Sequence, residues 1–152
     1  MKLGDVVLVV AFICTSSIGI LKGSCNPFKE HEIPLIVKQA FEKEFPGKKA
    51  SWEVENGNYE AEFDIDQTHA SVTYGHDGVR LEMEIEIAMN LMPPAALIFM
   101  KQKHAGIKIK ETSKITDKNN IITYEAEIKN EGKSIDVIFD DQGKFIKETE
   151  GE

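Results

Sequence analysis

One pattern occurs twice in this chain, at a fixed offset of 65 residues. The segment Tyr-Glu-Ala-Glu-Phe at 59–63 returns as Tyr-Glu-Ala-Glu-Ile at 124–128. The same offset relates Val72-Thr73-Tyr74 to Val137-Ile138-Phe139, and Gly78 to Gly143. Copies of one sequence pattern fold in the same way, so a repeat at a fixed period defines a structural unit. We therefore predict two similar strand-rich units, over residues 34–90 and 91–152.

Each unit begins with a helix signal. In the first, Pro34 fits the first helical position, and Val37 and Phe41 follow at the spacing of one buried helix face. In the second, Pro93-Pro94 precede a helix predicted over 95–104, which is apolar almost all round. A helix without a polar side packs on two sides. We expect it to lie between the sheet and either the first helix or a partner protein.

Four strand-like runs follow each helix, separated by turn residues such as Asn56-Gly57 and Asp141-Gln142-Gly143. Strands that are joined by tight hairpins pair antiparallel. The prediction is an α+β fold, in which tandem α-β-β-β-β repeats form one antiparallel sheet of about eight strands with two helices on one face. The runs cover residues 50–55, 59–66, 70–74 and 79–87 in the first unit and 107–117, 121–129, 134–139 and 144–149 in the second.

Alternation along the strands predicts an oily face and an acidic face for this sheet. Aromatic, aliphatic and alanine side chains share one face of 59–63 and of 124–128, and glutamates occupy the other. The same alternation runs through 81–87. The assignment depends on register, because a slip of one residue exchanges the two faces.

Two interpretations of the acidic face remain open. In the first, the oily face packs against the helices and the acidic face is solvated. In the second, like charges that lie about 7 Å apart along a strand are relieved by a cationic partner or ion. The second interpretation makes these glutamates candidate partner-binding residues: Glu60, Glu62, Glu82, Glu84 and Glu86.

Residues 1–25 predict export. Lys2 precedes a nearly unbroken apolar run from Val6 to Leu21. A membrane span needs about 20 residues, and this shorter run suits the core of a secretory signal peptide. An uncleaved N-terminal anchor is the alternative. In either case, residues 26–33 are predicted to form a tether between the leader and the first unit.

The segment Leu21-Lys22-Gly23-Ser24-Cys25 resembles a bacterial lipobox, in which small residues precede a cysteine that becomes lipidated. Cys25 is therefore the lipidation candidate, and ordinary signal cleavage near Ser24 is the alternative. The expected location is the periplasm or the outer membrane, with a lipid anchor. Membrane contact is expected only through that lipid or through an uncleaved leader.

Charge and cysteine content exclude several classes of function. Without the leader, 16 basic and 25 acidic residues remain, a formal net charge of −9. Such a surface repels nucleic acid phosphates, so nucleic acid is not an expected partner. Cleavage removes Cys14, and a lipidated Cys25 leaves no thiol for a disulfide, a metal site or thiol catalysis.

Motifs for enzyme chemistry and metal binding are lacking in the sequence. It contains no Gly-x-Ser-x-Gly elbow, phosphate loop or dinucleotide fingerprint. Its four histidines lack ligand spacing, and His69 and His76 should point to opposite faces of one strand. Asp64 and Asp66 share a face, but no calcium-loop glycine and glutamate follow them. We predict no enzyme, no cofactor and no transition-metal site.

The first unit resembles the PepSY-like domains of secreted bacterial proteins. The resemblance rests on Pro34, Ala40-Phe41, Phe45-Pro46-Gly47, Trp52, Tyr59-Glu60-Ala61 and Gly78. The second unit, from Tyr124-Glu125-Ala126-Glu127 to Val137-Ile138-Phe139-Asp140-Asp141-Gln142-Gly143-Lys144, resembles another copy. The resemblance implies the architecture of the β-lactamase-inhibitor-like (BLIP-like) group, whose repeats form one eight-stranded sheet that grips a partner protein on its concave side.

This resemblance implies a noncatalytic envelope protein that binds or inhibits a partner protein. PepSY modules are associated with restraint of peptidases, and the inhibitor group blocks β-lactamases. The present chain differs from the secreted inhibitors in having no mature disulfide and no recognisable inhibitory loop, so no family site residue transfers to it. The alternative is an envelope protein that uses the same carboxylates to bind cations, such as calcium, or a basic small ligand. A purely structural role is the third possibility.

Overall fold

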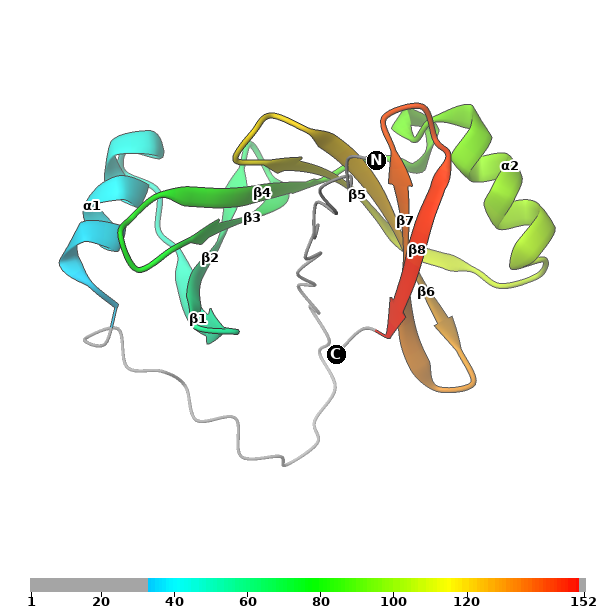
Figure 1. Ribbon diagram of the computed structural model, residues 1–152, viewed down its shortest axis with the longest axis horizontal. Coiled ribbons are helices and arrows are strands. Elements are labelled where there is room, and N and C mark those ends of the chain that lie inside the picture. The colour runs from blue at the N-terminus through cyan, green and yellow to red at the C-terminus, as the bar shows by residue number, and fades with distance from the viewer. Residues whose placement is uncertain (1–32, 151–152) are drawn as a thin grey trace, which may run out of the picture.

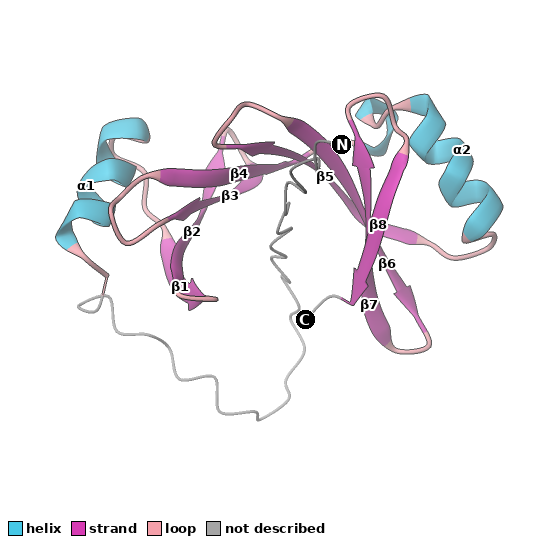
Figure 2. Cartoon of the chain, in the orientation of Figure 1, coloured by secondary structure: helices cyan, strands magenta, loops and turns pink. Residues whose placement is uncertain are grey.

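The computed structural model describes residues 33–150, which form one eight-stranded antiparallel sheet and two α-helices (Figures 1 and 2). Each strand pairs with its neighbours in sequence, from β1 at one edge to β8 at the other. The elements are α1 (Leu35–Glu44), β1 (Ser51–Glu55), β2 (Asn58–Ile65), β3 (Thr68–Tyr74), β4 (Arg80–Glu86), the 3-10 helix η2 (Met89–Leu91), α2 (Pro94–Lys103), β5 (Ile109–Asp117), β6 (Ile122–Asn130), β7 (Lys133–Asp140) and β8 (Phe145–Glu150). The predicted α+β class and single sheet are confirmed, whereas the duplication of one unit stays a prediction.

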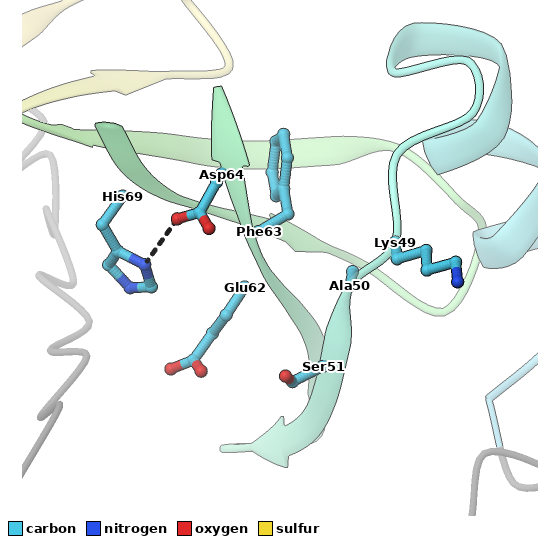
Figure 3. A pocket seen from close by; sticks show the side chains of 7 residues that line it. All are labelled: Lys49, Ala50, Ser51, Glu62, Phe63, Asp64 and His69. Carbon is cyan, nitrogen blue, oxygen red and sulfur yellow. Dashed lines mark ion pairs between the residues drawn. The ribbon is translucent and has the colours of Figure 1, made fainter. Parts of the chain in front are cut away.

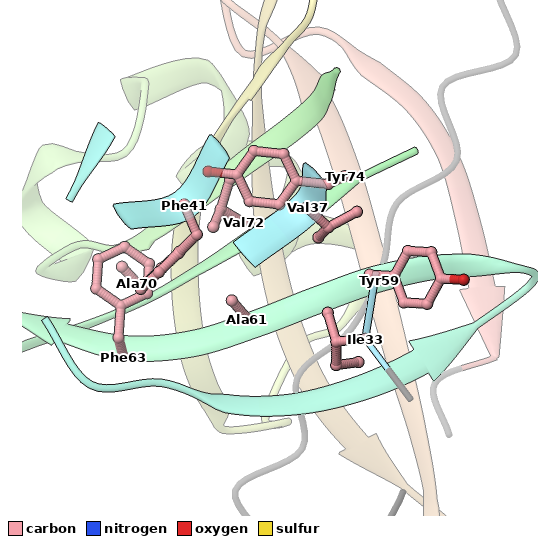
Figure 4. Close-up of a cluster of buried hydrophobic side chains, with 9 residues drawn as sticks. All are labelled: Ile33, Val37, Phe41, Tyr59, Ala61, Phe63, Ala70, Val72 and Tyr74. Carbon is pink, nitrogen blue, oxygen red and sulfur yellow. The ribbon is translucent and has the colours of Figure 1, made fainter. Parts of the chain in front are cut away.

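Helix α1 packs on the first half of the sheet through the side chains that the helical spacing predicts to be buried. Val37 and Phe41 are buried, and the Phe41 ring meets Phe63 edge-on with 5.1 Å between ring centroids. Figure 4 shows this cluster, to which Tyr59 also belongs. Trp52 packs against it from β1, 5.4 Å from Phe41. Tyr59 and Trp52 therefore both contribute to the core of this half.

Helix α2 packs in the same way on the second half of the sheet. Ala96 and Met100 are buried in a cluster with Ala126, Val137 and Phe139 from β6 and β7. In these clusters the apolar side chains pack against one another and are removed from water, which is the main favourable contribution to folding. Each half of the sheet thus has its own helix and its own core.

Two glycines at equivalent positions of the repeat let a hairpin turn approach the start of the helix in each half. Gly78 has a φ of +75°, and a Cβ atom placed there would lie 3.0 Å from the Ile36 carbonyl oxygen. Gly143 has a φ of +80°, and a Cβ atom there would lie 2.8 Å from the Ala96 nitrogen. Only glycine combines this backbone angle with this closeness at low cost. The equivalence explains why the repeat preserves glycine at this point.

Both helices lie on the same face of the sheet. The register places Ala61 opposite Val72 and Val72 opposite Met83, and in the second half it places Tyr124 opposite Lys114 and Phe139. Pairing between β4 and β5 shows that these residues of the two halves share one face. Met83 and Ile85 lie on the same face of β4, and Ile85 is opposite Lys114. Figure 1 shows a curved sheet with the helices on its outer side, so its other face is the concave face.

The expectation that the apolar helix packs against the first helix is wrong. Figure 1 shows α1 and α2 at opposite ends of the molecule. Each helix is short and covers only its own half of the sheet, so the two do not meet. The outer side of α2 carries Ile98, a residue that is 57% exposed. A partner protein on this side of α2 stays a prediction.

No helix within residues 33–150 is long and apolar enough to cross a membrane. The predicted signal peptide, the tether up to residue 32 and the lipidation candidate Cys25 all lie outside the described residues.

Candidate functional site

The five predicted glutamates lie together on the concave face. The register places Thr73 opposite both Glu60 and Glu82, and Ser71 opposite both Glu62 and Glu84. Two rows of alternating carboxylates and hydroxyls therefore cross from β2 to β4. Glu86 continues the acidic side of β4 and is opposite Ser113. The alternation along these strands predicted the shared face correctly.

The expectation that the acidic face is solvated is only partly right. Glu60 is 1% exposed, Glu82 7% and Glu84 8%, while Glu62 is half-buried and Glu86 is exposed. Strands β2 and β4 are interior strands of a curved sheet, so the side chains of neighbouring strands on both sides cover their concave-face residues. Glu60, Glu82 and Glu84 are therefore buried carboxylates, which alternation alone does not reveal.

The second half contributes further acidic residues to this face, which were not among the predicted binding residues. Glu125 is opposite Ser113, and Glu127 is opposite both Glu111 and Asp136. Glu125, Glu127 and Asp136 are buried. The repeat contained the signal for two of them, because Glu125 and Glu127 stand 65 residues after Glu60 and Glu62.

A β-bulge explains why Glu111 could not be assigned by alternation. Ile109 is opposite Ile128, and Glu111 is opposite Glu127, with an irregularity between the two pairs. Strict alternation would place Ile109 and Glu111 on the same face. The extra residue of a bulge reverses the order of faces along one strand, so Ile109 joins the core and Glu111 joins the carboxylates.

Burial raises the pKa of several of these carboxyl groups. The pKa of Glu60 rises to about 7, that of Glu84 to about 8 and that of Asp136 to about 7. The pKa values of Glu125 and Glu111 are also raised. Loss of hydration is the largest cause in each case, and repulsion between neighbouring carboxylates adds to it. The concave face therefore holds acidic groups that exchange protons near neutral pH.

Hydrogen bonding within the cluster is incomplete. Glu127 accepts hydrogen bonds from Lys110 Nζ at 2.8 Å and from the Ser134 hydroxyl. In contrast, neither carboxylate oxygen of Asp136 has a hydrogen-bond partner among residues 33–150. A buried polar group without a partner costs stability, and a buried charge costs more. Such a group marks a candidate functional site.

A shallow pocket of about 350 Å³ lies at the outer end of the concave face, beside β1 and β2 (Figure 3). Glu62, Asp64 and His69 line it, with Ser51 on the neighbouring strand. His69 Nδ1 lies 3.9 Å from Asp64 Oδ1. Figure 3 shows these polar side chains on one side of β2 and Phe63 on the other. The pocket is polar and open, and it extends the acidic face toward the edge strand.

His69 and His76 lie on opposite sides of the sheet, as parity predicts. His69 pairs with Asp64 on the concave side, whereas His76 Nδ1 lies 3.0 Å from the Tyr59 hydroxyl on the helix side. No group of three or more histidine, cysteine, aspartate or glutamate side chains in the described part of the chain is arranged to hold a metal ion.

Solved structures share this fold. A DUF2874 family protein from Bacteroides uniformis aligns over 77% of this chain and 88% of its own, with a TM-score of 0.68 and 16% identity. A candidate periplasmic protein from Bacteroides eggerthii aligns over the same shares, with a TM-score of 0.69 and 12% identity. A BLIP-like protein from Bacteroides fragilis aligns over 77% and 85%, with a TM-score of 0.60 and 20% identity.

No protein-family model and no curated protein matches the sequence. The structural likenesses, all at low identity, support the expected BLIP-like fold. The relationship to PepSY domains stays a prediction.

Proposed function

We propose that this protein is a noncatalytic binding module of the cell envelope, which holds a partner protein against the concave face of its sheet. One observation carries the proposal. Carboxylates from β2, β4, β5, β6 and β7 gather on that one face, and several of their buried oxygens have no partner within residues 33–150. The partner surface would therefore be basic, because cationic side chains compensate carboxylates that the fold leaves uncompensated.

Separate observations support the proposed location in the cell envelope. The leader sequence predicts export, and one protein of the same fold is described as a candidate periplasmic protein. Another is described as BLIP-like. A periplasmic location fits both the leader and these likenesses, whereas a lipid anchor on Cys25 rests on the lipobox resemblance alone. Inhibition of a peptidase or of a β-lactamase would be a special case of the same binding.

The test is affinity capture from native envelope extract, with the protein purified in mild detergent as bait. The double variant E62Q/E86Q removes the charge of the two least buried of the five glutamates and leaves Glu60, Glu82 and Glu84 in the sequence. We expect it to retain at least about tenfold less of the captured protein, because rim charges that steer association are lost. Mass spectrometry of the eluate quantifies the retained protein.

The matched control is E131Q/D141N, which removes the same charge from two exposed hairpin turns. It should capture as much as the unchanged protein. Equal capture by both double variants, with both folded by circular dichroism, would remove the concave face from the proposal. Calorimetric titration with calcium tests the alternative function, and heat of binding that E62Q/E86Q abolishes would favour a cation-binding protein instead.

A further inference from the structure

Asp136 differs from the other acidic residues of the concave face. It lies on β7 opposite Glu127, and it is fully buried, with 0% of its surface exposed. Neither of its carboxylate oxygens has a hydrogen-bond partner among the residues that the structure describes. An aspartate in this state destabilises the fold whenever it is charged. It therefore requires an explanation other than stability.

The first half of the sheet shows that the fold does not require an acidic residue at this position. Residue 71 precedes residue 136 by the repeat offset, and it is a serine. The two residues also have equivalent strand partners, since Ser71 is opposite Glu62 and Asp136 is opposite Glu127. The second half thus has a carboxylate where the first half has a neutral hydroxyl. The same backbone and packing accept both, so the charge at Asp136 is specific to the second half.

The charged groups around Asp136 leave an excess of negative charge. Glu111 and Lys110 face it from β5, Glu125 and Glu127 from β6, and Lys147 from the edge strand β8. Lys110 is engaged with Glu127, with 2.8 Å between Nζ and Oε1. Lys110 and Lys147 lower the pKa of Asp136, whereas Glu127 and Glu111 raise it, and Asp136 in turn raises the pKa of Glu125.

Lys110 illustrates how a cationic side chain can reach this cluster. Its ammonium group reaches the buried Glu127 carboxylate, while the side chain of Lys110 itself is 40% exposed. A flexible cationic side chain therefore enters the cluster from the solvent side. Lysine and arginine bury their stems and keep their charged heads at polar groups, so a cationic side chain of another molecule can approach in the same way.

We propose that Asp136, flanked by Glu111 and Glu125, is a subsite for a lysine or arginine side chain of the partner. The inference rests on the proposed function, and it identifies the partner segment as basic and its anchor as a cationic side chain in the second half of the concave face. Burial raises the pKa of Asp136 to about 7, so an entering cation would displace a proton. Binding should therefore strengthen as the pH rises from 6 to 8.

The probe is a fluorescently labelled hexalysine peptide, and its affinity for the full chain is measured by anisotropy at pH 8 and low salt. The variant D136N keeps the shape of the side chain and removes the charge. We expect it to weaken peptide binding about tenfold, which corresponds to the loss of about 1.4 kcal/mol. The matched control is D141N, the same chemical change in an exposed turn two positions before Gly143, and it should change the affinity less than about twofold.

Thermal unfolding distinguishes a binding role from a structural one. D136N should raise the melting temperature at pH 8, because it removes a buried carboxylate without a partner. Weaker peptide binding together with higher stability supports the subsite. Unchanged peptide binding by D136N overturns the subsite. A lower melting temperature of D136N, together with an equal loss of peptide affinity in D136N and D141N, also overturns it.

Failure of the subsite and failure of the proposed function can be told apart. If D136N binds the peptide normally while E62Q/E86Q loses partner capture, the subsite is wrong and the concave face is still the binding face. If the unchanged protein does not bind hexalysine at all, the subsite is wrong, and capture alone decides the function. A rise in melting temperature with calcium that D136N abolishes, without peptide binding, would assign the position to a metal ion and overturn the peptide ligand.

Discussion

Single residues on the concave face hold acidic groups in an environment that favours their neutral form. Glu60 is 1% exposed, and burial raises its pKa from 4.5 to about 7, with repulsion from Glu53 and Glu62 adding and the Ser71 hydroxyl opposing. Such a group is neutral in mildly acidic solution and becomes a buried charge above neutrality. Glu60 therefore reduces the stability of the fold above neutral pH and has little effect on it in mildly acidic solution.

We expect E60Q to raise the melting temperature at pH 8 and to change it little at pH 5. At pH 8 the unchanged Glu60 is charged and buried, whereas glutamine carries no charge. At pH 5 Glu60 is protonated in the folded protein and glutamine resembles it closely. Differential scanning calorimetry at both pH values measures the difference, with E131Q as a control on an exposed turn. A lower melting temperature of E60Q at pH 8 would show that the carboxylate is stabilising.

Among the elements, the helices and hairpins followed the sequence closely, and strand β5 did not. The run of 79–87 was predicted as a strand, and β4 covers Arg80–Glu86. The run 107–117 was also predicted, but the bulge between Ile109 and Glu111 changes which face the first residues of β5 occupy. A bulge arises from pairing with another strand, so the local pattern of β5 does not contain it.

The close contact between the β7–β8 turn and α2 predicts a marked effect of G143A. Its methyl group would lie 2.8 Å from the Ala96 nitrogen and the Pro93 Cβ atom, at a φ of +80°. We expect a loss of about 2 kcal/mol in unfolding free energy, as for other combined strain and overpacking changes. The control G132A has a φ of +86° and nothing within 4 Å of the added methyl group.

G132A therefore isolates the backbone strain, and G143A should cost distinctly more in urea unfolding. Equal losses in the two variants would mean that the turn moves away from α2 without penalty, so the contact would not hold the hairpin and helix together.

At the scale of the whole molecule, the carboxylates of the two halves act as one group. Glu84 belongs to the first half, and its charge raises the pKa of Glu125 in the second half. Conversely, Glu111 of the second half raises the pKa of Glu84. They interact because β4 pairs with β5 and makes the two halves one sheet. Stability and charge of the protein are therefore linked across the full width of the concave face.

We expect the melting temperature to fall as the pH rises from 5 to 8. The folded protein keeps protons on Glu60 and Asp136 up to about pH 7, whereas the unfolded chain releases them near their ordinary values of 4.5 and 3.8. Between these limits the folded state binds more protons, so unfolding becomes easier with pH, by up to about 1.4 kcal/mol per pH unit for each group. A melting temperature that is constant or rises over this range would contradict the burial of these groups.

The sequence by itself determined the order of elements, the antiparallel sheet and the separation of oily and acidic faces. It also determined that the five glutamates from Glu60 to Glu86 share one face. These properties depend on short-range patterns, namely helical spacing, strand alternation and turn residues, which neighbouring residues carry together. Tertiary structure alone decided that Glu60 and Glu84 are buried and that Asp136 meets Glu127 without a hydrogen-bond partner of its own within residues 33–150. Burial and cross-strand contact depend on register, bulges and curvature, and these are set by pairing between segments that lie far apart in the chain.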